Sequence, residues 1–576
     1  MSSSQTILDI AEICAQQGVN ELILSPGSRN APLTLAFSRH PAIRTRLIPD
    51  ERSAGYVALG VAQSLKQPVI LLSTSGTAAL NFGPAISEAY YQHIPLLVFT
   101  ADRPPEWIDQ NDGQAIRQRN VFENHVKKSF ELPVSLDHKD AIWQLQRTVN
   151  EAIITAKIGV PGPVHINVPL REPLYPDTDQ PWEYHKKVPV INFRETNKNL
   201  SQEHWNSLKG QWTNASNVLI VGGQSAISPN LVAALEHIQN FGKVPVLGDV
   251  VSNLHHLNNV VAHPEIILGQ EETRLEKLQP DLLITFGGNL VSKNLKLFLR
   301  NYPASTHWHV QDTEFPPDTF KSLSEIVPMD PNTFFTELGK VIPEAHKSAW
   351  YQQWQTEETR ACELVQKFID SQQFCELQAV DIVLKAAKKV HLHLANSTPV
   401  RWVDLVGVAP SRRQRLGPAE TETIEISANR GTSGIDGCTS TAVGHALTNG
   451  KQNLLITGDM ALFYDRNAFW HQYKIPNLKI VLLNNHGGGI FRLLDGPRKQ
   501  PELEELFVTN QSLSAVNIAE DFGMKYLHCN NAKDLTKYLT HLFEPYDQPC
   551  ILEIEFPNQM SDIYQKLKAS IKNSHE

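Results

Sequence analysis

Residues 454–491 constrain the fold more than any other part of the chain. Two apolar runs of strand length begin at Leu454 and Lys479, and a helix-like segment lies between them. Each run ends in small or oxygen-bearing residues, which predicts a β-α-β unit with two parallel strands ending side by side. Because doubly wound sheets bind ligands at the carboxyl ends of their strands, we expect a ligand site at this corner.

This corner offers oxygen atoms of the kind that bind Mg²⁺. Asp459 follows the first run and Asn485 follows the second, so a carboxylate and an amide oxygen are brought together. Both are hard oxygen donors, which suit Mg²⁺ with a diphosphate completing its coordination shell. The run Gly487-Gly488-Gly489 lets backbone approach phosphate and turns a carbonyl toward a metal. A Gly-Asp dipeptide alone more often marks a helix N-cap, but the glycine-rich corner at the matching place favours a metal site. We predict Asp459, Asn485 and the Gly487 carbonyl as its ligands.

The same alternation of helix and strand fills the rest of the 576 residues, which is enough for three or four domains of about 150 residues. A proline-rich stretch over residues 169–189 and a charged, helix-prone stretch over residues 343–375 interrupt it and are interpreted as connections. We therefore predict an α/β protein of three doubly wound parallel-sheet domains, at residues 1–180, 190–345 and 360–576.

Composition excludes several classes of protein. A net charge of −9 argues against a nucleic-acid-binding surface, and six scattered cysteines without a CxxC motif indicate a reduced chain without a zinc finger. No apolar run approaches the roughly 18 residues of a membrane span, so we expect a cytoplasmic protein. The corners at residues 222–223 and 287–288 lack a GxGxxG motif, and none of the 22 histidines is assigned a catalytic role.

Gly458-Asp459, followed 26 residues after Asp459 by Asn485 and its neighbour Asn484, resembles the fingerprint of thiamine diphosphate-dependent decarboxylases and carboligases. Met460 departs from it, because the general pattern has a second glycine there. Residues 49–56 resemble the glutamate segment of these enzymes, which implies that Glu51 hydrogen-bonds the aminopyrimidine and promotes its imino tautomer. From these residues alone, a carboxylate that interacts with the dipole at a helix N-terminus is the better interpretation of Glu51; the rest of the fingerprint reverses that preference.

The same resemblance assigns the remaining cofactor contacts. Residues 430–437 form a polar, glycine-rich loop before a helix, and in similar enzymes a bulky apolar residue of this loop supports the bent cofactor. Ile435 fits that role, although locally it is as readily a core residue. The expected cofactor-binding residues are Glu51, Ser397, Ile435, Gly458, Asp459, Met460, Asn485, Gly487, Ile490 and Phe491.

Five further segments, residues 24–33, 75–78, 100–106, 113–118 and 429–437, are similar to the 2-succinyl-5-enolpyruvyl-6-hydroxy-3-cyclohexene-1-carboxylate synthases of the menaquinone pathway. The resemblance implies decarboxylation of 2-oxoglutarate and conjugate addition of the succinyl unit to isochorismate. Two dicarboxylate substrates call for arginine-rich pockets. By resemblance Ser397, Arg401 and Arg430 take the succinyl end, Arg29, Gln114 and Lys293 take isochorismate, and Arg103 also binds substrate.

Some of these assignments compete with simpler ones. Any single arginine is more often a solvated surface charge, and Gly113 stands where the family pattern leads us to expect asparagine. The resemblance implies a homodimer or a dimer of dimers in which Glu51 and Asp459 come from different subunits. The alternatives are a carboligase of acetolactate-synthase type that uses pyruvate, a non-catalytic paralogue that binds nucleotide or a partner, and a plain nucleotide-binding enzyme, for which no phosphate loop is found.

Overall fold

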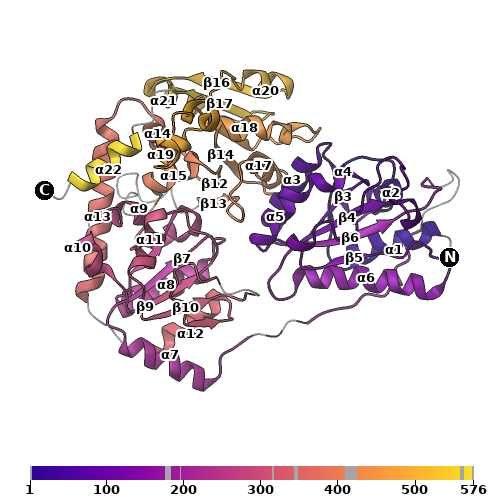
Figure 1. Cartoon of the computed structure of the whole chain (residues 1–576), viewed down its shortest axis with the longest axis horizontal. Helices are drawn as coiled ribbons and strands as arrows, with labels where there is room; N and C mark the ends of the chain where they lie inside the picture. The colour runs from indigo at the N-terminus through magenta and orange to yellow at the C-terminus, as the bar shows by residue number, and fades with distance from the viewer. Residues whose placement is uncertain are drawn as a thin grey trace. The chain divides into compact units, whose positions relative to one another are not determined.

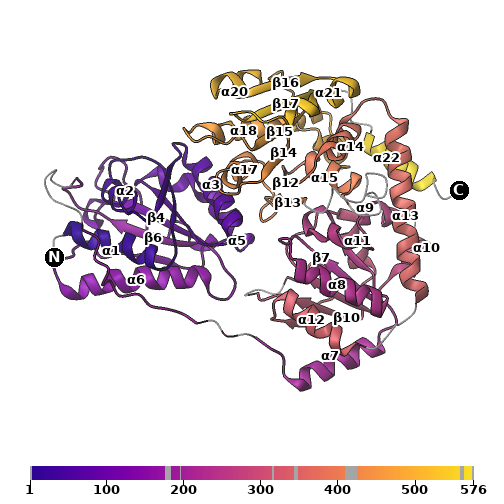
Figure 2. The same ribbon diagram turned by 180° about the vertical axis from the view of Figure 1, so that it is seen from behind.

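The computed structural model describes residues 3–175, 183–194, 196, 198–270, 272–313, 317–342, 348–408, 424–557 and 563–573. These residues contain three parallel sheets of six, five and six strands, each covered by helices (Figures 1 and 2), which confirms the predicted α/β class. Two compact units share the chain: the first holds Met1–Thr196, Gly431–Gly450 and Tyr464–Ile475, and the second holds the remaining residues.

The first unit is built on a sheet of strand order β2-β1-β3-β4-β6-β5. Every residue of β3, β4 and β6 is buried, as expected for apolar strands with helices on both faces. Helices α1, α2 and α6 cover one face and α3 and α5 the other. The bounds are β1 Glu21–Leu24, β2 Arg44–Leu47, β3 Val69–Ser73, β4 Leu96–Asp102, β5 Ser129–Glu131, β6 Val164–Pro169, α1 Ser3–Gln16, α2 Ala31–Ser38, α3 Glu51–Leu65, α5 Gly83–Tyr91 and α6 Lys139–Lys157.

Residues 77–91 form two helices, α4 (Thr77–Asn81) and α5, and a proline stands in the first turn of α5, where its missing N–H is tolerated. One expectation for this unit needs correction. The proline-rich stretch is not only a connection, since Tyr184 and Val188 pack against the core of the first sheet. Residues 176–182 of that stretch lie outside the described residues.

The middle sheet, in the second unit, has the strand order β11-β10-β9-β7-β8. Helices α8 and α12 pack together on one face of this sheet, and α9 and α11 pack together on the other face. The bounds are β7 Val218–Gly222, β8 Val246–Gly248, β9 Leu282–Phe286, β10 Thr306–Val310, β11 Glu325–Val327, α7 Gln202–Asn214, α8 Pro229–Gly242, α9 Pro264–Ile267, α11 Lys293–Asn301 and α12 Pro331–Val341.

The third sheet has the order β13-β12-β14-β15-β17-β16, which repeats the connectivity of the first sheet. The predicted β-α-β unit is present, but its helix α18 (Asp459–Tyr464) is short and is followed by a 3₁₀ turn, η6 (Arg466–Phe469). The other bounds are β12 Val390–Leu394, β13 Glu425–Ala428, β14 Gln452–Gly458, β15 Leu478–Asn484, β16 Lys525–Cys529, β17 Cys550–Glu555, α14 Glu376–Ala386, α15 Thr398–Val406, α17 Cys438–Ala446, α19 Ile490–Leu493, α20 Val516–Asp521, α21 Ala532–Leu542 and α22 Ile563–Asn573.

Helix α13 (Ser348–Ser371) joins the middle and third sheets into one core. Its Trp354 is fully buried in a cluster that contains Leu283 of β9 and Leu392 of β12. On the same helix Glu358 accepts hydrogen bonds from the backbone N–H of His263 (3.1 Å) and from its ring Nδ1 (2.7 Å). The helix that was interpreted as a connection is therefore also a core element of the second unit.

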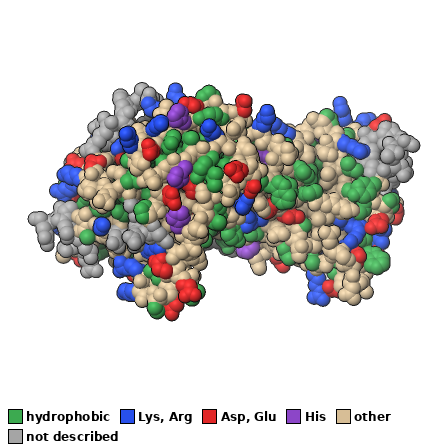
Figure 3. Space-filling view, turned by 90° about the horizontal axis from the view of Figure 1, so that it is seen from above, with side chains coloured by type: hydrophobic (Ala, Val, Ile, Leu, Met, Phe, Trp, Pro, Cys, Tyr) green, Lys and Arg blue, Asp and Glu red, His purple; other side chains and the backbone are tan. Residues whose placement is uncertain are grey.

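The surface gives no sign of an extended basic area on the face drawn in Figure 3, where described acidic and basic side chains are interspersed. Among the described helices none is long and apolar enough to cross a membrane.

Candidate active site

The carboxyl edge of the third sheet gathers residues from three strands. Gly458, the last residue of β14, lies opposite Leu483 of β15, so Asp459 and Asn485 emerge next to each other. On the other side β12 pairs with β14, and its carboxyl end leads to Ser397, which precedes α15. The strand order changes direction between β12 and β14, where open sheets of this kind bind their ligands.

Asp459 is buried and held in place at one oxygen. Gln511 Nε2 donates a hydrogen bond to its Oδ2 at 2.6 Å. Burial raises the pKa of Asp459, while this hydrogen bond and the nearby backbone N–H groups of Met460 and Gly487 oppose the shift. Such a carboxylate is one that a nearby cation would stabilise in its charged form. Gln511 lies 52 residues after Asp459 in the chain and was not predicted as a site residue.

Asn485 has one end of its amide in use and the other unused. Its Nδ2 donates to Glu376 Oε1 at 2.5 Å. Its Oδ1 is buried and accepts no hydrogen bond from any described residue. A buried acceptor without a donor is costly unless something else binds it. The oxygen predicted as a metal ligand is therefore the one atom of this side chain that the surrounding protein leaves unsatisfied.

Glycines beside Asn485 keep backbone close to this corner. Gly487 has φ +155°, and a Cβ there would lie 2.8 Å from the carbonyl oxygen of Val508. A Cβ on Gly489 would lie 2.8 Å from Asn485 Nδ2. Larger residues cannot replace either glycine without displacing its neighbours. The oxygen donors, the unsatisfied amide oxygen and the closely approaching glycine backbone together fit a divalent cation bound to a diphosphate.

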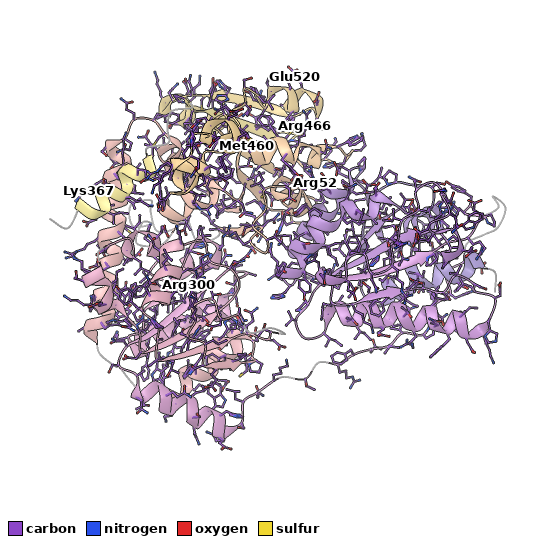
Figure 4. All side chains as sticks on the ribbon, viewed as in Figure 1. Arg52, Arg300, Lys367, Met460, Arg466 and Glu520 are labelled. Carbon is purple, nitrogen blue, oxygen red and sulfur yellow. The ribbon has the colours of Figure 1, made fainter. Side chains whose placement is uncertain are left out.

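The other predicted cofactor contacts of the second unit surround the same edge. Met460 is the residue after Asp459 and is labelled in Figure 4. Ile490 opens α19 and is half-buried, and the Phe491 ring lies 5.8 Å from that of Phe507. Apolar side chains after the glycine run provide the kind of wall that a cofactor ring needs.

A cavity of about 110 Å³ opens beside this edge. Lys293 of α11, Arg401 of α15 and Ile490 line it, so two predicted substrate residues meet a predicted cofactor residue. Glu265 and Tyr564 also line it, and the Tyr564 hydroxyl donates to Glu265 at 3.0 Å. Neither of these two was predicted, because Tyr564 belongs to the carboxyl-terminal helix α22, far from every motif in the sequence.

Arg401 and Arg430 place two guanidinium groups close together in the second unit. Burial, followed by the charge of Arg430, lowers the pKa of Arg401. Arg401 donates to the Ser397 carbonyl at 2.5 Å, and Arg430 donates to Asn396 Oδ1 at 2.8 Å. Arg430 is only 6% exposed, so the surface-charge interpretation is wrong for it. A pair of desolvated cations is suited to a carboxylate-bearing ligand.

The first unit contains the remaining predicted residues, beginning with Glu51. Helix α3 starts at Glu51, and Asp50 caps it by accepting a hydrogen bond from the Ser53 N–H at 3.1 Å. Glu51 is half-buried, and burial together with the charge of Asp50 raises its pKa. No other described side chain donates to its carboxylate. Asp50 thus performs the capping role, which leaves Glu51 available for other chemistry.

Arg29 lies at the corresponding change of direction in the first sheet, between β1 and β3. Its Nη1 donates to the Leu170 carbonyl at 3.1 Å, whereas its Nε is buried and has no acceptor among the described residues. The loop is tightly packed, because a Cβ on Gly27 would lie 2.3 Å from Thr74. Arg29 is 6% exposed, which again excludes a solvated surface charge.

Arg103 and Gln114 occupy a more exposed loop of the first unit. Arg103 Nη2 donates to the Gly113 carbonyl at 2.7 Å and its Nε lies 3.0 Å from Asp112. Gln114 is exposed and has φ 56°, an unusual backbone conformation for a residue with a side chain. The partner of Arg103 at residue 113 is a backbone carbonyl, which any residue provides. Glycine in place of the expected asparagine therefore does not affect this hydrogen bond.

Ile435 is half-buried in the loop before α17, also in the first unit. Two carboxylates organise this loop. Glu88 accepts hydrogen bonds from the N–H groups of Gly431 (2.8 Å) and Thr432 (2.6 Å), and Asp436 accepts one from the Tyr56 hydroxyl (2.9 Å). Glu88, an acid that is fully buried in α5, was not predicted.

His391 and His393, at alternate positions of β12, are buried within the sheet. The rings of His391 and His393 stack with centroids 4.4 Å apart, and burial lowers the pKa of His391 to about 3. His391 Nε2 is hydrogen-bonded to Ser427 Oγ at 2.8 Å. Buried neutral rings of this kind belong to the core of the sheet.

The fold and this edge define the class of protein. Residues 8–129 match the thiamine pyrophosphate enzyme N-terminal TPP binding domain, residues 176–393 the middle domain of thiamine pyrophosphate enzymes, and residues 421–554 the C-terminal TPP binding domain. The chain is thus a thiamine diphosphate-dependent enzyme with all three of its characteristic domains.

Whole-length relatives narrow this class. The 2-succinyl-5-enolpyruvyl-6-hydroxy-3-cyclohexene-1-carboxylate synthase of Cytophaga hutchinsonii is 42% identical over 575 residues, 99% of this chain and 100% of the relative. The synthases of Flavobacterium johnsoniae (37%, 97% of each chain) and Porphyromonas gingivalis (36%, 96% of this chain and 95% of the relative) are similar. The chain belongs to the family of 2-succinyl-5-enolpyruvyl-6-hydroxy-3-cyclohexene-1-carboxylate synthases.

Proposed function

We propose that the protein decarboxylates 2-oxoglutarate and adds the succinyl unit to isochorismate, with thiamine diphosphate and Mg²⁺ or Mn²⁺, in menaquinone biosynthesis. The observation that carries the metal and cofactor assignment is the unsatisfied, buried Oδ1 of Asn485 beside the Asp459 carboxylate. The substrate assignment rests on the family and on the paired Arg401 and Arg430, which suit a dicarboxylate better than pyruvate.

In this proposal Asp459, Asn485 and the Gly487 carbonyl hold the metal, which fixes the diphosphate. Bound thiamine diphosphate supplies a carbon nucleophile and stabilises the charge left by loss of CO₂. Glu51 hydrogen-bonds a ring nitrogen of the aminopyrimidine, and its raised pKa favours sharing that proton. Further cofactor contacts come from Ser397, Ile435, Gly458, Met460, Ile490 and Phe491.

The protein's basic side chains bind and orient the two substrates. Arg401 and Arg430, with Ser397, hold the succinyl carboxylate, and their burial strengthens that attraction by excluding water. Isochorismate is assigned to Arg29, Arg103, Gln114 and Lys293. Lys293 lines the same cavity as Arg401, which supports neighbouring positions for the two substrates.

We also propose a cytoplasmic homodimer, or a dimer of dimers, with three domains at residues 1–180, 190–345 and 360–576. In each active site Asp459 of one subunit and Glu51 of the partner subunit act on the same cofactor. Closed two-fold symmetry is the commonest way for identical chains to build such shared sites.

A substrate panel tests the function directly. The purified protein with thiamine diphosphate and Mg²⁺ is given 2-oxoglutarate or pyruvate, each with and without isochorismate, and CO₂ and adduct are measured. We expect adduct from 2-oxoglutarate and isochorismate, with activity lost after removal of metal by EDTA and recovered with Mg²⁺. Preferential turnover of pyruvate would instead identify a carboligase of acetolactate-synthase type, and no metal-dependent cofactor binding would identify a non-catalytic paralogue.

A further inference from the structure

Glu376 is a buried carboxylate that none of the motifs includes. It is the first residue of α14 and contacts two elements of the candidate site at once. Its Oε1 accepts a hydrogen bond from Asn485 Nδ2 at 2.5 Å, and its Oε2 accepts one from Trp402 Nε1 at 2.5 Å. Because each oxygen has its own donor, the carboxylate is held at both ends.

The chemistry of these partners fixes the direction of the Asn485 amide. Burial raises the pKa of Glu376 to about 7, and the two donors favour its ionised form. In that form the carboxylate only accepts hydrogen bonds, and an indole N–H only donates. Asn485 must therefore turn its NH₂ toward Glu376, which directs Oδ1 away from Glu376. That Oδ1 is the buried oxygen with no donor among the described residues. Without such a partner, the two ends of an amide differ little in shape, and either could face a cation.

We propose that Glu376 is a positioning residue that holds the Asn485 amide with its oxygen toward the metal and links this ligand, through Trp402, to helix α15. This inference rests on the proposed function. Helix α15 carries Arg401, next to Trp402, so the same carboxylate connects the metal corner with the wall of the substrate cavity. Partners of metal ligands commonly set the orientation of the ligand in this way.

The variant Glu376→Gln tests the proposal because it keeps the size of the side chain and removes one acceptor. Glutamine places its one oxygen toward either Trp402 or Asn485 and its NH₂ toward the other. With the oxygen on Trp402, the NH₂ favours a reversed Asn485. We expect Mn²⁺ affinity at saturating thiamine diphosphate, measured by electron paramagnetic resonance of free Mn²⁺, to fall about 10- to 100-fold. We expect excess metal to restore most of kcat.

Asp381→Asn is the matched control. Asp381 is a buried carboxylate on the same helix α14, but it pairs with Lys385 at 2.7 Å. The Mn²⁺ affinity of the Asp381→Asn variant should stay within about twofold of that of the unaltered protein. If Glu376→Gln binds Mn²⁺ as tightly as this control, the proposal is wrong. If the unaltered protein binds neither Mn²⁺ nor thiamine diphosphate, the proposed function fails instead.

A crystal structure of the unaltered protein with Mg²⁺ and thiamine diphosphate gives a test that needs no variant. We expect Asn485 Oδ1 on the metal while Nδ2 still donates to Glu376. An Asn485 side chain turned away from Glu376, or bound to the metal without that hydrogen bond, would overturn the proposal even if Glu376→Gln does not fold.

Discussion

At the scale of single residues, the candidate site is defined by which atoms the protein has already used. Asp459 has one oxygen bound by Gln511, and Asn485 has its nitrogen bound by Glu376. In Asn485 the opposite atom, Oδ1, is left without a donor from the described residues. Side chains held in this way are already oriented, so a cation that bound to them would require less ordering.

Glu51→Gln tests the central catalytic assignment. The amide keeps the helix start, which depends on Asp50, but it cannot share a proton with the aminopyrimidine. We expect CO₂ release from 2-oxoglutarate to fall about 10²- to 10⁴-fold. Glu151→Gln, at an exposed ion pair with Lys128 on the same unit, should leave the rate unchanged. Turnover at the normal rate in Glu51→Gln would remove Glu51 from the mechanism.

Arg401→Lys tests the substrate pocket. Lysine keeps the charge but loses the planar fork that matches a carboxylate, so we expect KM for 2-oxoglutarate to rise about tenfold or more. Initial rates over a range of 2-oxoglutarate concentrations measure this. Arg300→Lys is the control, because Arg300, labelled in Figure 4, is an exposed residue of α11 that donates to the Thr319 carbonyl. An unchanged KM in Arg401→Lys would contradict the assignment.

Sequence reasoning found residues that follow strands in recognisable motifs and missed those that support them. Asp459 and Asn485 lie at adjacent strand ends as predicted, because parallel strands separated by one helix bring their carboxyl ends together. Glu376, Gln511 and Glu88 were missed. Each acts through a hydrogen bond to a residue far away in the chain, and no local pattern encodes such a contact.

At the scale of elements, two glycines allow α3 and α17 to pack closely within the first unit. A Cβ on Gly60 would lie 2.1 Å from the Thr441 carbonyl oxygen, and one on Gly444 would lie 2.3 Å from the Val57 carbonyl oxygen. Both distances are far inside van der Waals contact. The two helices approach backbone to backbone, which only glycine permits.

Gly60→Ala should therefore destabilise the protein although alanine favours helices. The added methyl forces α3 and α17 apart, and we expect a loss of about 1–3 kcal/mol or more in the free energy of unfolding, measured with urea. Gly210→Ala is the control, since Gly210 is exposed in α7 and a Cβ there meets nothing within 4 Å. That variant should gain stability. Equal stability of Gly60→Ala and the unaltered protein would show that these helices separate easily.

The His263–Glu358 pair gives the second unit a pH-dependent contact between α13 and the segment before α9. Burial opposes both charges, but Cys362 and Glu358 raise the pKa of His263 well above 6.5, and His263 lowers the pKa of Glu358 below 4.5. The stabilisation due to His263 is complete below its ordinary pKa and is lost as pH rises through the raised value. The contribution of Glu358 is complete above its ordinary pKa and is lost at lower pH.

The pair should therefore stabilise the fold most between pH 4.5 and 6.5 and progressively less at alkaline pH. The free energy of unfolding is measured with urea at a series of pH values from 6 upward, for the unaltered protein and for the variant His263→Gln. The difference between the two proteins gives the contribution of the pair. We expect the difference in unfolding free energy between the two proteins to shrink as pH rises. A constant difference would mean that His263 is neutral in the folded state.

At the scale of the whole molecule, the same strand connectivity occurs in the first and third sheets, although the sequence contains no evident repeat. Long apolar strands were predictable because complete burial leaves little choice of residue. The short edge strands β2, β5 and β11 were not, since they are only partly buried and carry polar residues such as Arg44 and Glu325. The α/β class could thus be predicted, while the extent of each sheet could not.

A mixture of two inactive variants tests the shared active site. Glu51→Gln and Asp459→Asn are each expected to be inactive alone. When both chains are co-expressed, hybrid dimers contain one site with an intact Glu51 and an intact Asp459, so activity should return to about a quarter of normal. Sedimentation of the mixture confirms dimers. No recovery would mean that both residues of a site come from one chain, and a fully active monomer would exclude shared sites altogether.

The packing of α3 against α17 also bears on the order in which the protein is made. Residues Ser53 to Ala62 of α3 are all buried, yet α17 begins only at Cys438. At about 5–20 residues per second, a ribosome needs some tens of seconds to reach that point after completing α3. During this interval the face of α3 that packs against α17 in the folded protein has no partner. The nascent chain is therefore a natural client for chaperones, and a fragment ending before residue 431 should aggregate.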